Sequence, residues 1–372
     1  MSDNPTRRAT PLDPRTASVS VVMPVRNEAG YVSTAVLSIL SQTFDPARTE
    51  IIAVDGMSED RTVSILAEAL GGRPNARVLS NPARTTTSGL NLAIRGTTAD
   101  VVLRVDGHCR LEPDYIERCV ELLAETSAGN AGGLMRPRGT TAIGQAMALA
   151  LCSRFGIGDS RFHYLERQEF VDSVYLGAFR RDVLLEVGLF DESLRANEDF
   201  ELNHRIREAG YGVLLSPTIR SSYVPRESVT SIGAQFYRYG RHKARVMRKH
   251  PESIQLRHLV PPVAVMTLLA AVLTRLVFRR KSLLPVWIYG GAVAFATLVT
   301  ARPKRLAPAL MLVFPAIHLS WGTGVLVGLL RMRGQLRDSA DDRDSETGSG
   351  NRADPWACST RTYPPSPQGR AR

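Results

Sequence analysis

The sequence has few cysteines, and they form no pattern that would build a zinc site or a disulfide framework. Its 372 residues contain four, Cys109, Cys119, Cys152 and Cys358, and no two of them have the spacing of a CxxC pair. Isolated cysteines of this kind exclude a zinc-finger protein and a small disulfide-stapled scaffold. We therefore expect free thiols in a reducing compartment.

The N-terminus lacks the apolar core of a secretory signal peptide. Residues 1–17, which begin MSDNPTRRATPLDPRT, are polar, and we expect them to form a disordered tail. The domain that follows is therefore expected to stay in the cytoplasm. Internal repeats are also absent, so a repeat architecture is not expected.

Acidic residues are in deficit. The chain has 47 Lys and Arg against 36 Asp and Glu, a net charge of +11, and a pI near 9.9. Such a balance favours an anionic partner: nucleic acid, anionic lipid or a phosphorylated substrate. A hydrophobic content of 44% excludes a disordered chain, and the length allows one large domain or two ordinary ones.

Apolar periodicity from Ser18 onward alternates between strand and helix. The alternation predicts an α/β fold with a mainly parallel sheet. Ligands of such sheets gather at the carboxyl ends of the strands, where Asp55 and Asp106 are both placed. Strands are expected at 18–25, 50–56, 76–80 and within 101–109, and helices at 30–42, 63–70, 86–95 and after Pro113.

Three long apolar stretches follow in the last third of the chain, at 259–278, 282–301 and 306–330. Each approaches the roughly 20 residues that a bilayer-spanning helix needs. Arg275 interrupts the first, although a charge near a helix end can snorkel. The alternative is a buried helical domain of a soluble protein. The polar tail, 331–372, is expected to be disordered.

A basic stretch comes directly before the first apolar segment. Between residues 235 and 258 the only acid is Glu252, and 246–258 is interpreted as a juxtamembrane segment that binds anionic lipid or a lipid-linked phosphate. A solvated helix face is the alternative. The basic residues are Arg238, Arg241, Lys243, Arg245, Arg248, Lys249 and Arg257.

Six short motifs carry a family resemblance. They are PVRNE (24–28), VDGMSEDRT (54–62), RVDGH (104–108), LGAFRR (176–181), NEDFEL (197–202) and QFYRYGR (235–241). This set, in this order, resembles the family 2 inverting glycosyltransferases of the GT-A fold, over about residues 18–245. The apolar stretches behind it are similar to those of succinoglycan-type membrane-anchored glucosyltransferases. The resemblance implies a Rossmann-like GT-A domain followed by transmembrane helices over 259–330.

The resemblance implies a nucleotide-sugar donor. Asp55 matches a family aspartate that accepts a hydrogen bond from the nucleotide base, which favours a UDP-sugar, while Gly56 replaces the family's second aspartate there. Simpler interpretations stay open: a helix cap for Asp55, a solvated charge for Glu28 and a paired strand charge for Arg104. The residues expected to bind the donor are Pro24, Asn27, Glu28, Asp55, Ser58, Arg84, Asn91, Arg104 and Asp106.

A divalent cation is implied at Asp106 and His108. The family's Asp-x-Asp motif holds a cation that neutralises the departing diphosphate, and hard oxygen ligands suit Mg²⁺ or Mn²⁺. Here His108 stands at the third position, which favours Mn²⁺. The alternatives are a His108 that only hydrogen-bonds the phosphate and an Asp106 that only ends its strand in a turn.

The resemblance also implies the general base. Asp199 matches the aspartate of the family's Glu-Asp motif, with Glu198 beside it, and would take the proton of the acceptor hydroxyl. An acidic first turn of a helix is the alternative. Gln235 and Arg238 resemble an imperfect Gln-x-x-Arg-Trp signature of processive polymerases, and Arg238 or Arg241 would bind the departing diphosphate.

These observations lead to one main hypothesis and its competitors. The main one is a multi-pass plasma-membrane glycosyltransferase with a cytoplasmic catalytic domain, which adds one sugar to a lipid-linked or saccharide acceptor in envelope or exopolysaccharide synthesis. Three spans would place the tail outside. The alternatives are a processive polysaccharide synthase and a non-catalytic membrane scaffold. A nucleic-acid partner is not expected, because it would explain neither the apolar stretches nor the carboxylates.

Overall fold

The chain folds into two compact units. The computed structural model describes residues 5–277 and 283–341. Among these, the first unit comprises residues up to 138 together with 160–225, and the second comprises 139–159 and the residues from 226 on. This division differs from the expected catalytic domain, 18–245, because an inserted segment and the residues after 225 belong to the second unit.

The first unit is built on a mixed sheet with a parallel half. Within the described residues nine strands pair, in the order β3-β2-β1-β4-β8-β6-β9-β5 with β7 on β9. Neighbours from β3 to β4 run parallel, and β8 pairs antiparallel with β4. The strands are β1 (Val19–Val25), β2 (Thr49–Asp55), β3 (Ala76–Ser80), β4 (Val101–Arg104), β5 (Cys109–Leu111), β6 (Ala128–Pro137), β7 (Glu169–Phe170), β8 (Tyr175–Arg180) and β9 (Gly212–Tyr223).

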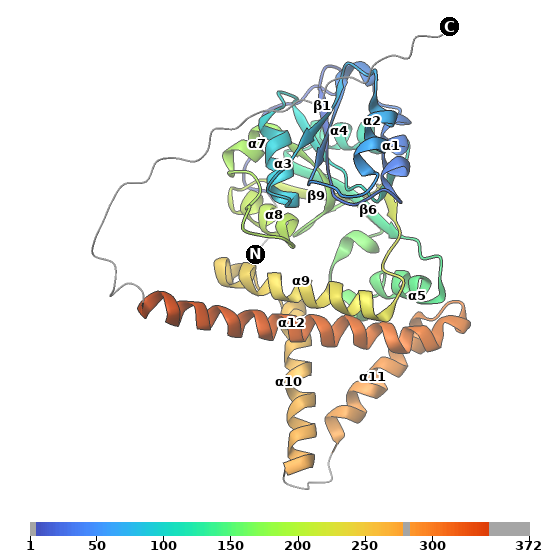
Figure 1. Ribbon diagram of the computed structural model, residues 1–372, viewed down its shortest axis with the longest axis vertical. Coiled ribbons are helices and arrows are strands. Elements are labelled where there is room, and N and C mark those ends of the chain that lie inside the picture. The colour runs from blue at the N-terminus through green and yellow to red at the C-terminus, as the bar shows by residue number, and fades with distance from the viewer. Residues whose placement is uncertain (1–4, 278–282, 342–372) are drawn as a thin grey trace. The chain divides into compact units, whose positions relative to one another are not determined.

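Helices cover both faces of this sheet (Figure 1). The strands are buried on both sides, so one hydrophobic core forms with α1, α2 and α4 and a second with α3, α7 and α8. This arrangement confirms the predicted α/β fold. The helices are α1 (Val32–Leu40), α2 (Thr62–Leu70), α3 (Thr86–Arg95), α4 (Tyr115–Glu125), α7 (Arg181–Glu186) and α8 (Glu198–Glu208).

The N-terminal segment packs on the first unit, contrary to the expected tail. The backbone N–H of Arg7 donates to the carbonyl oxygen of Gly210 at 3.0 Å, and the Thr10 hydroxyl donates to Asp182 at 2.7 Å. The polar residues of 5–17 thus have partners on the domain surface, which composition alone does not reveal. Residues 1–4 lie outside the described residues.

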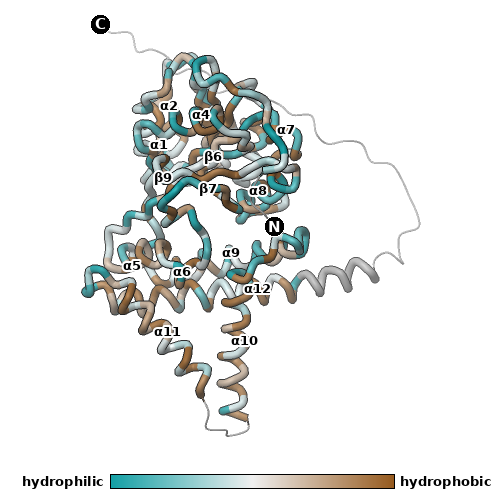
Figure 2. Tube along the Cα trace, turned by 180° about the vertical axis from the view of Figure 1, so that it is seen from behind, coloured by the Kyte–Doolittle hydropathy of each residue, from teal (hydrophilic) through white to brown (hydrophobic). Residues whose placement is uncertain are grey.

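The second unit is helical. α9 and α12 lie side by side, and α10 and α11 project away from α12 (Figure 1). The apolar colouring is densest on these projecting helices and on parts of α12 (Figure 2). The helices are α5 (Ala142–Leu151), α6 (Arg154–Ile157), α9 (Val229–Lys249), α10 (Leu256–Val277), α11 (Leu284–Thr300) and α12 (Ala307–Asp341).

Helices occupy all three of the expected apolar stretches. Among the described residues, two helical segments are long and apolar enough to cross a membrane: 256–277, with a mean hydropathy of 1.9, and 304–331, with 1.7. α11, with 17 residues, is shorter. α12 continues to Asp341, so the expected C-terminal tail begins later than residue 331, and its remainder, 342–372, lies outside the described residues.

Candidate active site

Three loops at the carboxyl ends of β1, β2 and β3 share a backbone feature. One residue in each has positive φ: Asn27 (55°), Met57 (61°) and Arg84 (57°). Non-glycine residues adopt this conformation at a cost, and such strain gathers at binding sites. Between these loops and the end of β4 lies a cleft of about 220 Å³. Its walls are Pro24, Val25, Arg26, Glu28, Val54, Gly56, Asn81, Arg84, Thr85, Thr86, Arg104, Asp106, Gly107 and His108.

Asp55 and Asn27 brace two of these loops. The buried Asp55 carboxylate accepts from the backbone N–H of Ser58, at 3.2 and 3.1 Å to its two oxygens. The Ser58 hydroxyl in turn accepts from the N–H of Asn27 at 2.9 Å, and the Asn27 side-chain oxygen accepts from the N–H of Glu59 at 2.9 Å. The loops after β1 and β2 are therefore fixed to each other at the rim of the cleft.

Arg104, at the end of β4, holds a cluster of carboxylates. Its side chain is only 6% exposed. Within the described residues the guanidinium donates from Nε to Asp106 at 2.9 Å, from Nη2 to Glu198 at 3.1 Å, and from Nη1 to Asp199. Arg104 lines the cleft, as expected of a donor-binding residue, but its described partners are these acids. It joins the turn after β4 to the start of α8.

Glu198 and Asp199 form the acidic first turn of α8. Asn197, directly before them, has a φ of 63° and begins the helix in the left-handed region. Acidic side chains are favoured at a helix N-terminus, but here both also point to Arg104. The interpretation of these acids as a mere helix start therefore does not account for their pairing.

Burial and the charges of the cluster together decide how its acids titrate. Burial alone would raise the pKa of Asp106, but Arg104, His108 and the hydroxyl of Tyr175 hold it below its usual value. Burial raises the pKa of Asp199 to about 7 against the opposing pull of Arg104, and the charges of Glu198 and Asp106 add to the rise. A carboxylate with a pKa near neutrality suits a general base.

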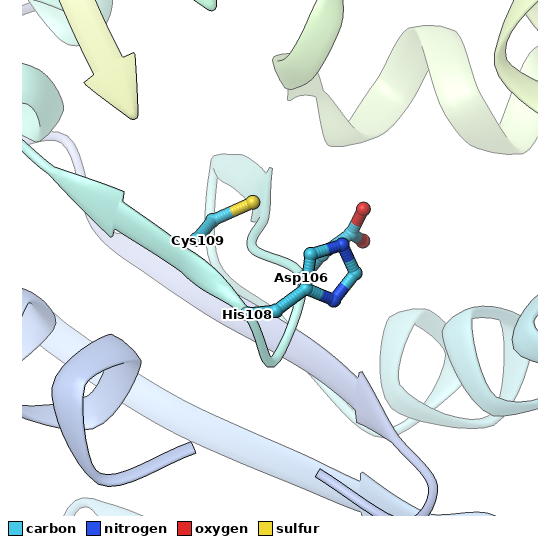
Figure 3. A group of neighbouring side chains, drawn as sticks. All are labelled: Asp106, His108 and Cys109. Carbon is cyan, nitrogen blue, oxygen red and sulfur yellow. The ribbon is translucent and has the colours of Figure 1, made fainter. Parts of the chain in front are cut away.

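Asp106 and His108 lie together at the turn between β4 and β5 (Figure 3). With Cys109 they bring three potential ligand atoms within 4.8 Å of one another. Nδ1 of His108 lies 3.1 Å from a carboxylate oxygen of Glu28, a contact typical of an imidazole that binds metal through Nε2. Asp106 and His108 therefore fit a divalent cation.

Cys109 fits a hard cation poorly. Burial raises the pKa of its thiol far above the usual value, so the sulfur stays protonated. The thiol contacts the hydroxyl of Tyr175 at 2.9 Å, and that hydroxyl donates to Asp106 at 2.8 Å. Tyr175 is thus a site residue that the sequence reasoning missed. It directly precedes the LGAFRR motif, but only the antiparallel pairing of β8 with β4 reveals its place.

The remaining expected residues fall into three groups. Pro24 and Arg84 line the cleft. Asn91 is buried, and its amide donates to Phe190 and to Glu192, so its described contacts are structural and its role in donor binding stays a prediction. The motif residues on α9 belong to the second unit, and their role also stays a prediction. These are Gln235, Arg238 and Arg241.

Residues 20–188 match the sequence model of the family described as Glycosyl transferase family 2. These residues are therefore similar to the family 2 glycosyltransferases. With the α/β fold and the acidic cluster at the carboxyl ends of its strands, this match identifies the protein as a glycosyltransferase of the GT-A type, as the resemblance had implied.

Two curated relatives extend over most of the chain. The succinoglycan biosynthesis protein ExoA of Rhizobium meliloti (strain 1021) is 28% identical over 321 residues, which cover 84% of this glycosyltransferase and 95% of that protein. A dolichyl N-acetyl-alpha-D-glucosaminyl phosphate 3-beta-D-2,3-diacetamido-2,3-dideoxy-beta-D-glucuronosyltransferase of Methanococcus voltae is 24% identical, covering 84% and 97%. Both alignments extend well beyond residues 20–188.

A solved structure shows the same fold. The mannosyltransferase PcManGT from Pyrobaculum calidifontis, in complex with GDP-Man and Mn²⁺, is 19% identical to the glycosyltransferase and has a TM-score of 0.59. The match covers 83% of this chain and 89% of that one. At this identity the likeness concerns the fold alone.

Proposed function

We propose that the protein is a membrane-attached inverting glycosyltransferase that moves one sugar from a UDP-sugar to a lipid-linked or saccharide acceptor. The observation that carries the proposal is the Arg104 cluster, because one buried guanidinium joins Asp106, the proposed metal and phosphate residue, to Asp199, the proposed base. A scaffold with a degenerate site would have no need of this buried charge.

In the proposed mechanism each residue acts at a separate stage. The braced loops after β1 and β2 receive the nucleoside beside Asp55, and Arg84 faces the phosphates from the cleft wall. Asp106 and His108 would hold a divalent cation, which neutralises the charge of the departing diphosphate. Asp199 takes the proton from the acceptor hydroxyl, and Arg104 keeps its carboxylate in place.

The acceptor and the setting are proposed from the relatives and the helices. The relatives act in succinoglycan biosynthesis and on a dolichyl-linked sugar phosphate, so a lipid-linked saccharide in exopolysaccharide or envelope synthesis is the proposed acceptor class. Apolar helices of membrane-spanning length support attachment to the plasma membrane. A nucleotide-sugar donor places the first unit on the cytoplasmic side.

A donor screen tests the proposal. Protein purified in detergent is incubated with UDP- and GDP-sugars, with Mn²⁺, Mg²⁺ or a chelator, and free nucleotide is measured. We expect UDP release with at least one UDP-sugar, faster with Mn²⁺ than with Mg²⁺ and absent with the chelator. Release from GDP-sugars alone would contradict the proposed donor, and full turnover with chelator would contradict the cation.

Asp199→Asn separates chemistry from donor binding. The amide keeps the shape of the carboxylate but cannot accept the proton, so kcat should fall by about 10² to 10⁴, the usual contribution of base assistance. Donor affinity, measured by calorimetry with UDP, should stay within about two-fold, while Glu198→Gln as the matched control should cost less turnover. The wild-type product should have the inverted anomeric configuration. Equal losses of UDP binding and turnover in Asp199→Asn would remove Asp199 from the role of base.

A further inference from the structure

α9 and α12 pack so closely that their backbones touch. A Cβ added at Gly240 would lie 2.1 Å from the carbonyl oxygen of Trp321, and one at Gly324 would lie 2.2 Å from that of Tyr237. Gly324 and Gly328 have the GxxxG spacing that permits such an approach. Gly233, near the start of α9, lies beside Ser320 of α12, and Ala244, further along α9, lies beside Gly328. The two helices therefore run in the same direction.

α9 is too basic to lie in the hydrocarbon of a bilayer. Its 21 residues include six Lys and Arg and no acid, and Arg238, Arg245 and Arg248 are exposed. Each such charge costs about 2.5–3.5 kcal/mol at the centre of a membrane helix, so together they forbid insertion. Because α12 packs along α9 from about residue 320 to 328, that part of α12 is held at the same depth, outside the hydrocarbon core.

α12 is apolar enough to cross a membrane, but it is longer than a single span needs and is covered by protein on one side. Its 35 residues extend about 52 Å, well beyond the roughly 30 Å of a hydrocarbon core. One side is covered by protein, with Leu310 and Phe314 fully buried, and the other is apolar and open, with Leu312 at 56% and Leu330 at 66% exposure. Since the contact with α9 keeps residues 320–328 out of the hydrocarbon core, this open apolar face is the part of α12 that meets the bilayer surface.

α10 and α11 have the opposite character. Leu269, Leu276, Trp287 and Leu298 are between 56% and 78% exposed, and the helices that carry them project from α12 and are largely apolar along their length (Figure 2). The 22 residues of α10 extend about 33 Å, enough to cross the hydrocarbon core, and α11 provides about 26 Å for the return. The start of α10 is anchored on α12, where a Cβ at Gly322 would lie 2.5 Å from the carbonyl oxygen of Pro261.

Basic clusters at the ends of the helices agree with this division. Arg302, Lys304 and Arg305 precede α12, and Arg331 and further basic residues end its apolar part. A two-helix hairpin leaves both clusters on the cytoplasmic side, as the positive-inside tendency favours, whereas a third span would carry the second one across. The basic residues at 279–281 follow the first span in either arrangement and so do not distinguish the two.

We infer that α10 and α11 form a membrane-crossing hairpin, while α9 and α12 lie together on the cytoplasmic surface of the bilayer. The inference rests on the proposed membrane attachment and replaces the expected three spans by two. Its consequence is that α12 ends on the cytoplasmic side of the membrane. The lipid partner of the α9–α12 pair is a bilayer surface, bound through the open apolar face of α12.

Thiol labelling in spheroplasts tests the sidedness of both ends. The full chain with Cys152→Ser keeps Cys358 after α12, while the buried Cys109 and Cys119 stay protected. A membrane-impermeant maleimide should leave intact spheroplasts unlabelled and should label Cys358 after permeabilisation. Adding Leu283→Cys, just before α11, should give labelling of intact spheroplasts that the parent lacks.

The labelling at Cys358, the labelling at position 283 and extraction at pH 11 test three separate parts of the inference. Labelling of Cys358 in intact spheroplasts would restore the third span and overturn the inference. An introduced thiol at position 283 that reacts only after permeabilisation would show that the hairpin does not cross. Release of the whole protein from membranes at pH 11 would contradict the proposed membrane attachment itself, which the two labelling results leave intact.

Discussion

At the scale of single residues, the site is governed by an excess of negative charge. One guanidinium, that of Arg104, forms ion pairs with three carboxylates: Asp106, Glu198 and Asp199. Burial disfavours the charged form of an acid, and the repulsion between the neighbouring acids adds to this effect against the attraction of the arginine, so one acid retains a proton near neutrality. Asp199 is the acid with the raised pKa, and its side chain, 21% exposed, is still reachable by an acceptor.

The raised pKa of Asp199 predicts a pH-dependent cost in stability. The folded protein binds this proton up to about pH 7, while the unfolded chain releases it near 3.8, so the free energy of unfolding should fall as the pH rises between these values. Asp199→Asn removes the effect. In thermal unfolding with chelator we expect the stability advantage of the variant over wild type to grow by about 1–3 kcal/mol between pH 5 and pH 8.

The same titration sets the pH profile of turnover. Because a base must be deprotonated, the wild-type rate should rise as the pH passes through about 7, while the residual rate of Asp199→Asn should not follow this rise.

The stability measurement has its own contradicting outcome. An Asp199→Asn variant that is less stable than wild type at pH 8 would mean that Arg104 depends on this carboxylate for its neutralisation.

Glu28 offers a test of whether His108 is a metal ligand. If Glu28 orients the imidazole for a cation, Glu28→Gln should weaken the apparent Mn²⁺ affinity by about 10- to 100-fold, as for other partners of metal-bound histidines. The measurement is UDP binding as a function of Mn²⁺ concentration, with Asp106→Asn as the variant that loses the dependence. An unchanged Mn²⁺ dependence in both Glu28→Gln and His108→Ala would leave His108 as a phosphate contact only.

The sequence reasoning found the separate parts of this site but not their connections. Asp55, Asp106 and Asp199 each follow a recognisable local pattern, a strand end or a helix start. Arg104 and Asp199 are 95 positions apart and meet only because β8 pairs with β4 and α8 follows it, so their ion pair has no local signal. Tyr175 was missed for the same reason.

At the scale of elements, the α9–α12 contact is the packing feature with the clearest test. Alanine normally stabilises a helix by about 1 kcal/mol over glycine. At Gly324 the added methyl would meet the backbone oxygen of Tyr237, whereas at Gly291 of α11 nothing among the described residues lies within 4 Å. We therefore expect Gly324→Ala to cost about 1–3 kcal/mol and Gly291→Ala to be neutral or stabilising.

Thermal unfolding of the two variants in detergent measures this difference. The pair is matched, because both are glycine-to-alanine changes in apolar helices of the second unit. Equal melting temperatures would show that α9 and α12 can separate at no cost. The glycine contact would then not hold α12 at the depth of α9.

Helices and strands with a strong apolar periodicity could be predicted from the sequence. Segments whose packing partners lie far along the chain could not. The first four strands and the helices between them appear within a few residues of their expected bounds, because each buries a continuous apolar face against the sheet. The N-terminal segment and the inserted segment 139–159, which packs in the helical unit, show no such apolar period. Their positions depend on partners far along the chain, such as Phe314, whose ring meets Phe155 edge-on at 5.0 Å.

At the scale of the whole molecule, the chain passes between the two units three times. It leaves the first unit at residue 138, returns at 160 and leaves again at 225. The inserted helices α5 and α6 therefore have their apolar partners in the C-terminal helices. A truncation at the boundary expected from the sequence, residue 245, would keep α5, α6 and most of α9 but remove α12.

This interleaving predicts which truncation is soluble. A chain of residues 1–245 should aggregate without detergent, because Phe155 loses Phe314 and the side of α9 that packs on α12, with Gly240 and Ala244, is uncovered. A chain of residues 1–225 in which a Gly/Ser linker replaces 139–159 keeps both cores of the sheet and should remain in the supernatant after ultracentrifugation. It should also bind UDP with Mn²⁺ in calorimetry, since the cleft and the Arg104 cluster come entirely from the first unit. If both chains sediment, the first unit needs the helices to fold, and if both stay soluble, the inserted segment does not depend on α12.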